Sequence, residues 1–463
     1  MNNKLIYQFS PSNTEGDKSM TDLLGGKGAN LAEMSLLGIN VPPGFTVTTE
    51  VCNYFMKHGN IPDNLDEELK QSLKNLEKTT NKIFDSDKKP LLLSVRSGGK
   101  ISMPGMMDSI LNIGINDKNL ESLSSDFNDE RFALDSYRRL IQMYGNVVLN
   151  IEMDRFEAIL DNKKRIDGVE KDNEFNPDQL RWIIDAFKTT VERFSKKSFP
   201  QDPNIQLNGA IEAVFKSWSN KRAVTYRKIN NIPDEWGTGV NVQSMVFGNL
   251  NEKSGTGVAF TRFPSTGKNK LYGEYLMNAQ GEDVVAGTRT PFPIGKHEKN
   301  TQPSLEEVNP AMYKEIKDIA DKLETHYKDV QDIEFTIEDS VVYILQTRSA
   351  KRTAQASVKI AVDMHNENLL TKEEAINMVD ANQITSVLHP QFKESSERDL
   401  FEKGLNASPG AAVGVIVFDP DTAELEAQKG RKVILVRDET SPEDIHGMFS
   451  SVGILTTKGG MTS

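Results

Sequence analysis

Residues 1–110 mix short strand-like runs with helical patterns, whereas the later stretches are mainly of one kind, and this organisation constrains the fold more than any single motif. A helical apolar period with many charges runs from about residue 115 to 235 and again over 352–400. Short apolar runs typical of strands lie at 45–49, 90–95, 239–262, 331–347, 412–418 and 432–436. Strands and helices grouped in this way predict an α+β fold. The simplest division is a large α+β domain at 1–352, a helical linker at 353–404 and a small, incomplete domain at 405–463.

Size, charge and cysteine content exclude several classes of protein. The 463 residues suffice for about three domains. A net charge of -12 argues against a nucleic-acid partner and against a membrane surface. Cys52 is the only cysteine, so neither an intrachain disulfide nor a cysteine-based zinc site is expected. No apolar run approaches transmembrane length and the first residues lack the regions of a signal peptide, so the expected location is cytoplasmic.

A glycine-rich segment, Gly25-Gly26-Lys27-Gly28, precedes a helical pattern that begins near Leu31. Backbone amides at a helix N-terminus can bind an anion, and Lys27 adds a compact positive charge. The spacing is not that of a Walker A motif. A plain turn before a helix is the commoner meaning of such glycines, so phosphate binding is one of two interpretations.

A second candidate begins where the apolar run 90–95 ends at Arg96. A guanidinium at the end of a strand can grip phosphate with two parallel hydrogen bonds, and the backbone amides of Ser97-Gly98-Gly99 can bind the same anion. The apolar segment Met103-Pro104-Gly105-Met106-Met107 then predicts a flap that excludes water. The alternative is a surface hairpin with a solvated arginine and methionines that fill a core.

A third glycine cluster, Ser254-Gly255-Thr256-Gly257, separates two strand-like runs at 242–247 and 258–261. A β-hairpin turn is the commoner meaning of such a cluster. A loop that folds over a triphosphate is the other interpretation, and it makes Gly255 a candidate contact.

The densest signal for chemistry lies in two short runs that flank residue 340. Polar and apolar residues alternate in the first run, so Asp332 and Glu334 share one face of a strand and suit a hard divalent cation such as Mg²⁺. Gln346 and Arg348 share a face of the second run. A hairpin of the two would place the carboxylates beside a phosphate-binding guanidinium, as phosphoryl transfer requires. An amphipathic hairpin with ordinary cross-strand ion pairs is the evenly weighted alternative.

Taken in order, these segments resemble the N-terminal half of the pyruvate, phosphate dikinase family. The matching text includes LLGGKGANLAEM, GINVPPGFTVTTE, LLSVRSG, SMPGMMDSILN, NVQSMVFGN, SGTGVAFTR, NAQGEDVVAGTRTP, QDIEFTIE, LQTR, ASPGAAVG, VILVRDETSPEDIHGM and GGMTS. The likeness runs from about residue 22 to the last residue. An ordered match of this length is more specific than any one of its motifs.

The resemblance implies an architecture and a reaction. It implies an ATP-grasp nucleotide-binding domain with a helical insertion at about 115–235, the helical linker, and the N-terminal part of an α/β swivelling phosphohistidine domain. In the family, ATP, inorganic phosphate and pyruvate are converted to AMP, pyrophosphate and phosphoenolpyruvate through a phosphohistidine. The family also implies Mg²⁺ as the cofactor and a homodimer formed mainly through a C-terminal barrel.

The resemblance also implies roles for individual residues. It assigns ATP phosphates to Lys27 and Arg96, Mg²⁺ to Asp332 and Glu334, and the rest of the phosphate pocket to Gln346 and Arg348. Arg96 and Arg348 are the catalytic candidates, and Lys100, Gly105 and Gly255 are weaker nucleotide contacts. Lys100 stands where relatives usually have arginine, which keeps the charge but loses the fork geometry.

The last residues lead to the expectation of an incomplete enzyme. In the family, GGMTS is followed by the histidine that carries phosphate, and neither that histidine nor the pyruvate-binding barrel is among these residues. We therefore expect a monomer that binds MgATP without turnover. A fragment of phosphoenolpyruvate synthase, which uses water as the second acceptor, is the alternative within enzymes. A non-catalytic nucleotide-binding regulatory module is the alternative from another class.

Overall fold

The computed structural model describes residues 4–285, 290–296, 302–381, 404 and 411–458. The chain divides into two compact units, Met1–Val246 and Phe247–Ser463. Both units combine helices with sheets, so the expectation of a mixed helix-and-sheet fold is confirmed. The division after residue 246 lies inside the stretch 1–352 that the sequence predicted as one domain, and that domain scheme stays a prediction.

An antiparallel sheet forms the centre of the first unit. Its five described strands pair in the order β1-β2-β5-β3-β4. They are β1 (Ile6–Phe9), β2 (Gly44–Val47), β3 (Leu93–Gly99), β4 (Ser109–Ile113) and β5 (Thr238–Ser244). Every residue of β5 is buried, because this strand lies between β2 and β3 in the middle of the sheet. The strands predicted near 45–49, 90–95 and 239 are therefore confirmed.

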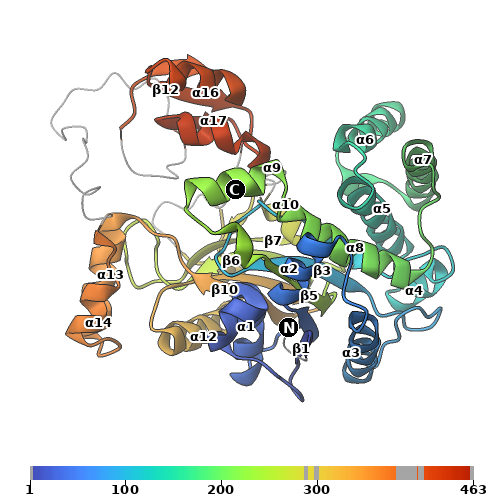
Figure 1. The fold of residues 1–463 in the computed structure, drawn as a ribbon, viewed down its shortest axis with the longest axis horizontal. Coiled ribbons are helices and arrows are strands. Elements are labelled where there is room, and N and C mark those ends of the chain that lie inside the picture. The colour runs from blue at the N-terminus through green and yellow to red at the C-terminus, as the bar shows by residue number, and fades with distance from the viewer. Residues whose placement is uncertain (1–3, 286–289, 297–301, 382–403, 405–410, 459–463) are drawn as a thin grey trace. The chain divides into compact units, whose positions relative to one another are not determined.

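Helices make up most of the rest of the first unit. Ahead of the helical block lie η1 (Lys18–Met20), α1 (Thr21–Leu36), α2 (Thr49–His58) and α3 (Leu65–Thr80). The block contains α4 (Leu120–Asp126), α5 (Glu130–Val147), α6 (Met153–Asp167), η2 (Asp172–Glu174), α7 (Pro177–Ser195), α8 (Pro203–Ser217), α9 (Lys221–Ile229) and η3 (Asp234–Trp236). The helical stretch predicted at about 115–235 is confirmed, and Figure 1 shows α5, α6 and α7 side by side.

The N-terminus of α7 shows how the sequence specifies these helices. Gln179 N donates to Asn176 Oδ1 at 3.0 Å, and Asn176 N donates to Gln179 Oε1 at 2.8 Å. This capping box satisfies amides that have no partner within the helix, and Pro177 occupies the first helical position. The buried face then repeats apolar residues at helical spacing, namely Leu180, Ile183, Ile184, Phe187 and Val191.

A second antiparallel sheet forms the centre of the second unit, with described strands in the order β10-β9-β6-β7-β8. They are β6 (Gly255–Phe260), β7 (Tyr272–Met277), β8 (Phe292–Pro293), β9 (Gln331–Glu338) and β10 (Val341–Ser349). Asp339 and Ser340 connect β9 to β10, and their φ angles of 45° and 71° give the two-residue turn that suits a hairpin. The predicted hairpin is therefore confirmed.

One side of β9 is apolar and lies in the core. Ile333, Phe335 and Ile337 alternate along the strand and are each 0% exposed. Helix α12 (Pro310–Tyr327) packs against β9 and β10. The alternation leaves the polar residues of β9 on the opposite side.

Further helices of the second unit surround or follow this sheet. They are α10 (Gly281–Val285), α11 (Leu305–Val308), α13 (Ala354–Asn366) and α14 (Lys372–Asn377). The helical pattern predicted from 352 is confirmed for α13 and α14, and a capping box is present where Glu374 N donates to Thr371 Oγ1 at 3.1 Å. The predicted linker residues 382–403 lie outside the described part of the chain.

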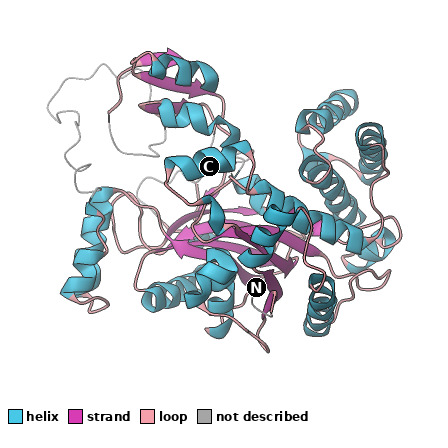
Figure 2. Cartoon of the chain, viewed as in Figure 1, coloured by secondary structure: helices cyan, strands magenta, loops and turns pink. Residues whose placement is uncertain are grey.

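Three parallel strands follow, in the order β11-β12-β13. They are β11 (Val415–Val417), β12 (Val433–Arg437) and β13 (Gly453–Thr456), with helices α16 (Pro420–Gln428), η4 (Pro442–Asp444) and α17 (Ile445–Ser450). Figure 2 shows these helices on one side of the strands, where a small core contains Val417, Ala423, Val433 and Leu435.

The last strand of this sheet is apolar but exposed. The strand forms as β13, but Ile454 and Leu455 are 43% and 58% exposed. The helices contact mainly β12, so among the described residues the edge strand has little cover. The terminal segment GGMTS, at 459–463, lies outside the described residues.

Candidate functional site

The register of the β9–β10 hairpin places four predicted site residues on one face of the second unit's sheet. Arg348 lies opposite Asp332, and Gln346 lies opposite Glu334. The register shifts next to Gln346, where Leu345 is the extra residue of a β-bulge. The bulge allows the apolar residues before it to stay in the core while Gln346 and Arg348 face the same side as the carboxylates.

Asp332 and Arg348 form an ion pair across the hairpin. Arg348 Nε and Nη2 both donate to Asp332 Oδ2, at 2.8 and 2.7 Å. The Asp332 residue is only 6% exposed, and this burial raises the pKa of its carboxyl although the charge and hydrogen bonds of Arg348 act in the opposite direction. The guanidinium therefore orients the carboxylate and offsets part of the cost of burying it.

The other oxygen of Asp332 fits a divalent cation. Asp332 Oδ1 is buried and has no hydrogen-bond partner in the described part of the chain, which is costly for a carboxylate oxygen. Glu334 lies two residues further along the same face. The described residues hold no group of three or more His, Cys, Asp or Glu side chains suited to a metal. Because Mg²⁺ often binds through one or two carboxylates plus water and phosphate oxygens, this pair fits a magnesium–phosphate ligand better than an isolated ion.

In the first unit, Lys27 lies in α1 and Arg96 in β3, where the helix packs on the strand. A Cβ added to Gly98 would lie 3.2 Å from Lys27 Cβ. Arg96 precedes Gly98 by two residues and so shares its face of β3. Its strand neighbours are Ser109 of β4 and Asn241 of β5, and its side chain is half-buried. The two predicted phosphate contacts thus lie on the same side of β3, and their role as phosphate contacts stays a prediction.

The glycines around Lys27 are explained by close packing of α1 on the sheet. They lie inside α1 rather than in a turn before it, and Gly25 kinks the helix with φ 68° and ψ 164°. A Cβ on Gly25 would lie 1.7 Å from Gly98 O, and one on Gly28 would lie 2.7 Å from Thr46 Oγ1. Glycine is therefore required at Gly25 by the approach of another backbone segment and at Gly28 by the approach of the Thr46 side chain. Anion binding by this segment stays a prediction.

Lys100 follows β3, and its ammonium group has two partners that the sequence did not reveal. Its Nζ forms an ion pair with Asp22 and lies 4.5 Å from the centroid of the Trp236 ring. A Cβ on Gly26 would lie 3.1 Å from the backbone oxygen of Lys100, so the residue lies beside the start of α1. Asp22 thus occupies the charge that was predicted to bind phosphate.

The loop predicted as a flap is packed against neighbouring helices. Met106 N donates to Met103 O at 3.1 Å, and Gly105 with φ 70° follows Pro104 at the corner of this turn. Met103 and Met106 are 6% and 5% exposed and belong to a cluster with Trp218, Ala223 and Ile232. The methionines therefore fill a small core, as the alternative interpretation expected.

Sequence reasoning missed the residues that fix the end of this loop. Asp108 forms an ion pair with Arg222 and accepts a hydrogen bond from Asn220 Nδ2 at 3.0 Å. Asp108 N donates to Ser217 Oγ at 3.3 Å, and Arg222 Nε donates to Met106 O at 3.2 Å. These partners are more than 100 residues away in the sequence, and no local pattern connects them to the loop.

The prediction of a hairpin turn at residues 254–257 was wrong. Gly255 and Gly257 lie in β6, which pairs with β7 and β9, whereas the preceding run forms β5 in the other unit's sheet. A Cβ on Gly255 would lie 2.7 Å from Leu276 O, and one on Gly257 would lie 2.5 Å from Phe335 Cζ. Close strand packing requires these glycines, and a nucleotide contact of Gly255 stays a prediction.

Comparison with known protein families assigns the chain to a class of enzymes. Residues 21–309 and 293–369 match the family model described as "Pyruvate phosphate dikinase, AMP/ATP-binding domain". Residues 430–463 match the model described as "PEP-utilising enzyme, mobile domain". The chain has the nucleotide-binding domain of a PEP-utilising enzyme. It belongs to the pyruvate, phosphate dikinase family.

Relatives from distant organisms agree with this assignment. The chain is 52% identical over 465 residues to pyruvate, phosphate dikinase of Rhizobium meliloti (strain 1021), which covers 99% of this chain and 52% of the relative. It is 50% identical to the enzyme of that name from Clostridium symbiosum, with coverage of 99% and 52%. It is 48% identical to "Pyruvate, phosphate dikinase, chloroplastic" of Mesembryanthemum crystallinum, with coverage of 99% and 48%. The chain therefore spans about half the length of the curated relatives it matches.

No helix among the described residues combines the length and the apolar character that crossing a membrane requires.

Proposed function

We propose that this chain binds ATP together with Mg²⁺ and that the β9–β10 hairpin carries the metal and part of the phosphate contacts. The observation that carries the proposal is the pairing across the hairpin, where two carboxylates lie opposite Gln346 and Arg348. One buried carboxylate oxygen there lacks a hydrogen-bond partner among the residues that the structure describes. The match to an AMP/ATP-binding domain supports the proposal. The further nucleotide contacts proposed are Lys27, Arg96, Lys100, Gly105 and Gly255.

The residues of the hairpin would act by positioning and charge compensation. Asp332 and Glu334 would hold the metal, and bound Mg²⁺ would neutralise charge on phosphate oxygens. Arg348 holds Asp332 through Oδ2 and so keeps Oδ1 available for a cation. Arg348 would stabilise the charge of the transferring phosphoryl group, which is the main requirement of this chemistry. Arg96 is the catalytic candidate of the first unit.

We further propose that the chain is the ATP-binding half of a longer phosphotransferase. An ATP-grasp domain at 1–352, a linker at 353–404 and the first part of a swivelling phosphohistidine domain at 405–463 would make up this half. The complete homodimeric enzyme would convert ATP, inorganic phosphate and pyruvate to AMP, pyrophosphate and phosphoenolpyruvate. The names of the relatives and their length support this proposal. A polypeptide of these 463 residues would be a monomer that binds MgATP without turnover, and a stable dimer in light scattering would contradict the monomer.

Calorimetric titration with ATP tests the metal contact in the Glu334→Gln protein. We expect one site per chain in the presence of Mg²⁺ and a loss of affinity of about tenfold, or ~1.4 kcal/mol, in the variant, because one of two metal-binding carboxylates becomes neutral. Omission of Mg²⁺ is expected to weaken binding to the unmodified chain more than to the variant. Glu373→Gln, which neutralises an exposed carboxylate in the first turn of α14, is the control. Equal affinity of all three proteins would contradict the metal assignment.

The ion pair between Asp22 and Lys100 leads to a prediction of tighter binding. Asp22→Asn removes the anion that competes with phosphate for the Lys100 ammonium, so affinity for MgATP is expected to rise about two- to threefold, the small effect typical of an exposed pair. The increase should disappear in the Lys100→Met background. Tryptophan fluorescence can follow the titration because Trp236 lies under this ammonium. Weaker binding by the Asp22→Asn protein would show that Asp22 itself supports the ligand.

A further inference from the structure

Arg262 is a fully buried arginine in the second unit that no predicted role uses. It lies two residues after the end of β6, and its side chain is 0% exposed. Its Nε and Nη2 donate to Glu324 Oε1 at 2.9 and 2.7 Å, and its Nη1 donates to Glu367 Oε1 at 3.1 Å. Nη2 also donates to Glu367 Oε2. One guanidinium thus joins the end of β6 to α12, which carries Glu324, and to Glu367 at the C-terminus of α13.

The charges of this cluster depend on one another. Burial alone would lower the pKa of Arg262, but the hydrogen bonds that it donates to Glu367 and Glu324 outweigh this effect and raise the pKa. The hydrogen bond from Arg262 lowers the pKa of Glu367. Removal of one partner from such a cluster leaves a buried charge uncompensated, so the three residues act as a unit.

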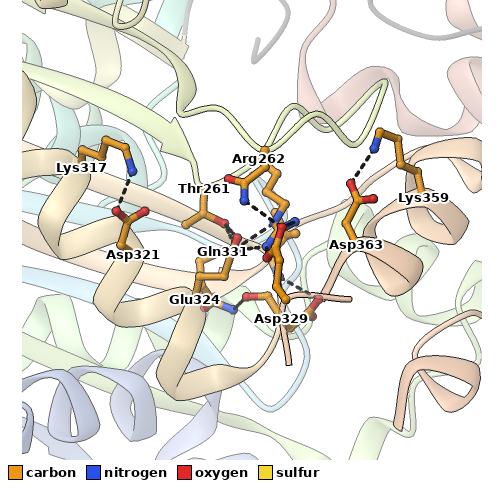
Figure 3. Close-up of polar contacts among 12 residues, drawn as sticks. Thr261, Arg262, Lys317, Asp321, Glu324, Asp329, Gln331, Lys359 and Asp363 are labelled. Carbon is orange, nitrogen blue, oxygen red and sulfur yellow. Dashed lines mark hydrogen bonds and ion pairs between the residues drawn. The ribbon is translucent and has the colours of Figure 1, made fainter. Parts of the chain in front are cut away.

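Hydrogen bonds extend from this cluster to the strands of the proposed metal site. Thr261 Oγ1 donates to Glu324 Oε2 and accepts a hydrogen bond from Gln331 N at 3.1 Å. Gln331 Oε1 in turn accepts a hydrogen bond from Thr347 Oγ1 at 2.9 Å. Figure 3 shows Arg262, Thr261, Glu324 and Gln331 gathered together. Gln331 immediately precedes Asp332, so the cluster fixes the start of β9 next to the proposed metal ligand.

A second set of contacts holds α13 near the start of β9. Asn269 Nδ2 donates to Glu367 Oε1 at 3.0 Å. Near the other end of the helix, Arg352 forms an ion pair with Asp329, whose backbone oxygen accepts a hydrogen bond from Gln331 Nε2 at 2.9 Å. The C-terminus of the helix is therefore held by Arg262, whose neighbour Thr261 contacts Gln331, and the segment before its N-terminus is held by Asp329, which also contacts Gln331. Helix α13 is also the first helix after the sheet on the way to the residues that match a mobile domain.

We propose that Arg262 is a positioning residue that couples the docking of α13 to the placement of Asp332 and Arg348, so that nucleotide binding and anchoring of the chain toward the mobile domain stabilise each other. This inference rests on the proposed function of the β9–β10 hairpin. Coupling through a shared cluster is reciprocal: a ligand that favours the ordered strands must also favour the docked helix. A purely structural Arg262 would give stability without that reciprocity.

Glu367→Gln tests the coupling with little risk to folding, because this residue lies at the rim of the cluster with 35% of its side chain exposed. Backbone amide exchange in residues 354–366 is expected to speed up about tenfold, and MgATP affinity to fall about fivefold. In the unmodified 463-residue chain, saturating MgATP is expected to slow the same exchange, and this effect should be lost in the variant. The control is Asp363→Asn, which removes an exposed ion pair with Lys359 on the same helix. Figure 3 shows this ion pair.

The outcomes separate this inference from the proposed function. One set of results would overturn the coupling alone. In it, the unmodified chain binds MgATP, the Glu367→Gln and Asp363→Asn proteins bind it with the same affinity, and MgATP has no effect on amide exchange in α13. Failure of the unmodified chain to bind MgATP would overturn the proposed function and the coupling with it. Arg262→Lys keeps the positive charge but loses the planar guanidinium that donates to both carboxylates. It should therefore reproduce the faster amide exchange and the weaker MgATP binding of Glu367→Gln. A lysine variant that behaves like the unmodified chain would also contradict the proposal.

Discussion

The Arg348→Ala protein is expected to be less stable than the unmodified chain and to bind MgATP at least about tenfold more weakly. The loss of affinity follows from removal of the guanidinium that faces the phosphates in the proposed site. The loss of stability follows from Asp332, which is 6% exposed and would keep a buried charge without its partner. Breaking a buried pair costs about 3–5 kcal/mol, and we expect about 2–3 kcal/mol here because Arg348 is 29% exposed.

A double variant separates the two effects of Arg348. Arg348→Ala combined with Asp332→Asn removes both charges, so it should recover part of the stability in urea unfolding while affinity for MgATP stays low. Burial already raises the pKa of Asp332 above 3.8, and loss of Arg348 raises it further. Near this pKa, the native state of the variant then binds more protons than its unfolded state. The loss of unfolding free energy in Arg348→Ala should therefore be complete above the raised pKa of Asp332 and become smaller as the pH falls toward 3.8. A single variant as stable as the unmodified chain at neutral pH would contradict this account of the pair.

Gly25→Ala adds a single methyl group and is expected to lower the free energy of unfolding strongly. Its backbone, at φ 68° and ψ 164°, lies in a region that is nearly restricted to glycine. The added Cβ would lie 1.7 Å from Gly98 O, so α1 or β3 must move. We expect about 1–3 kcal/mol for the strained backbone and at least about as much again for the displacement. Lys27 shares this helix, so MgATP affinity should fall together with the free energy of unfolding.

Gly38→Ala provides the matched control for Gly25→Ala. Gly38 also has a positive φ, of 69°, but a Cβ there would meet nothing within 4 Å. This variant should therefore lose only about 1 kcal/mol and keep its affinity for MgATP. Urea unfolding and calorimetry of both proteins measure the difference. Equal losses would mean that positive φ alone, and not the approach of α1 to β3, determines the cost.

The sequence predicted those elements that depend only on residues close together in the chain. The alternation along β9 and β10 predicted both the hairpin and the shared face of Asp332 and Glu334, because a strand has a period of two and the connecting turn is short. The helical block was predicted in the same way from its apolar period. The bulge at Leu345 was not predicted, since an extra residue leaves no mark in an apolar run.

Features that depend on distant parts of the chain were missed or misread. The cluster at 254–257 has the composition of a turn, but its glycines are required by strands that approach from residues 276 and 335. The partners of Arg262 lie 62 and 105 residues away, and those of Asp108 lie more than 100 residues away. Nothing in the sequence near Lys100 indicated that Asp22 and Trp236 would hold its ammonium group. These contacts are set by tertiary packing, which a single sequence does not display.

The central claim, that the β9–β10 hairpin is the metal–phosphate site, is tested most directly by paramagnetic NMR with Mn²⁺ in place of Mg²⁺. Methyl groups of Ile333, Ile337 and Ile344 in the hairpin report on the position of the ion, and the Mg²⁺ complex is the diamagnetic reference. The account predicts that MnATP broadens these methyl signals more than other isoleucine signals and that Glu334→Gln reduces the effect. Saturable binding of MnATP with the strongest broadening elsewhere would contradict it.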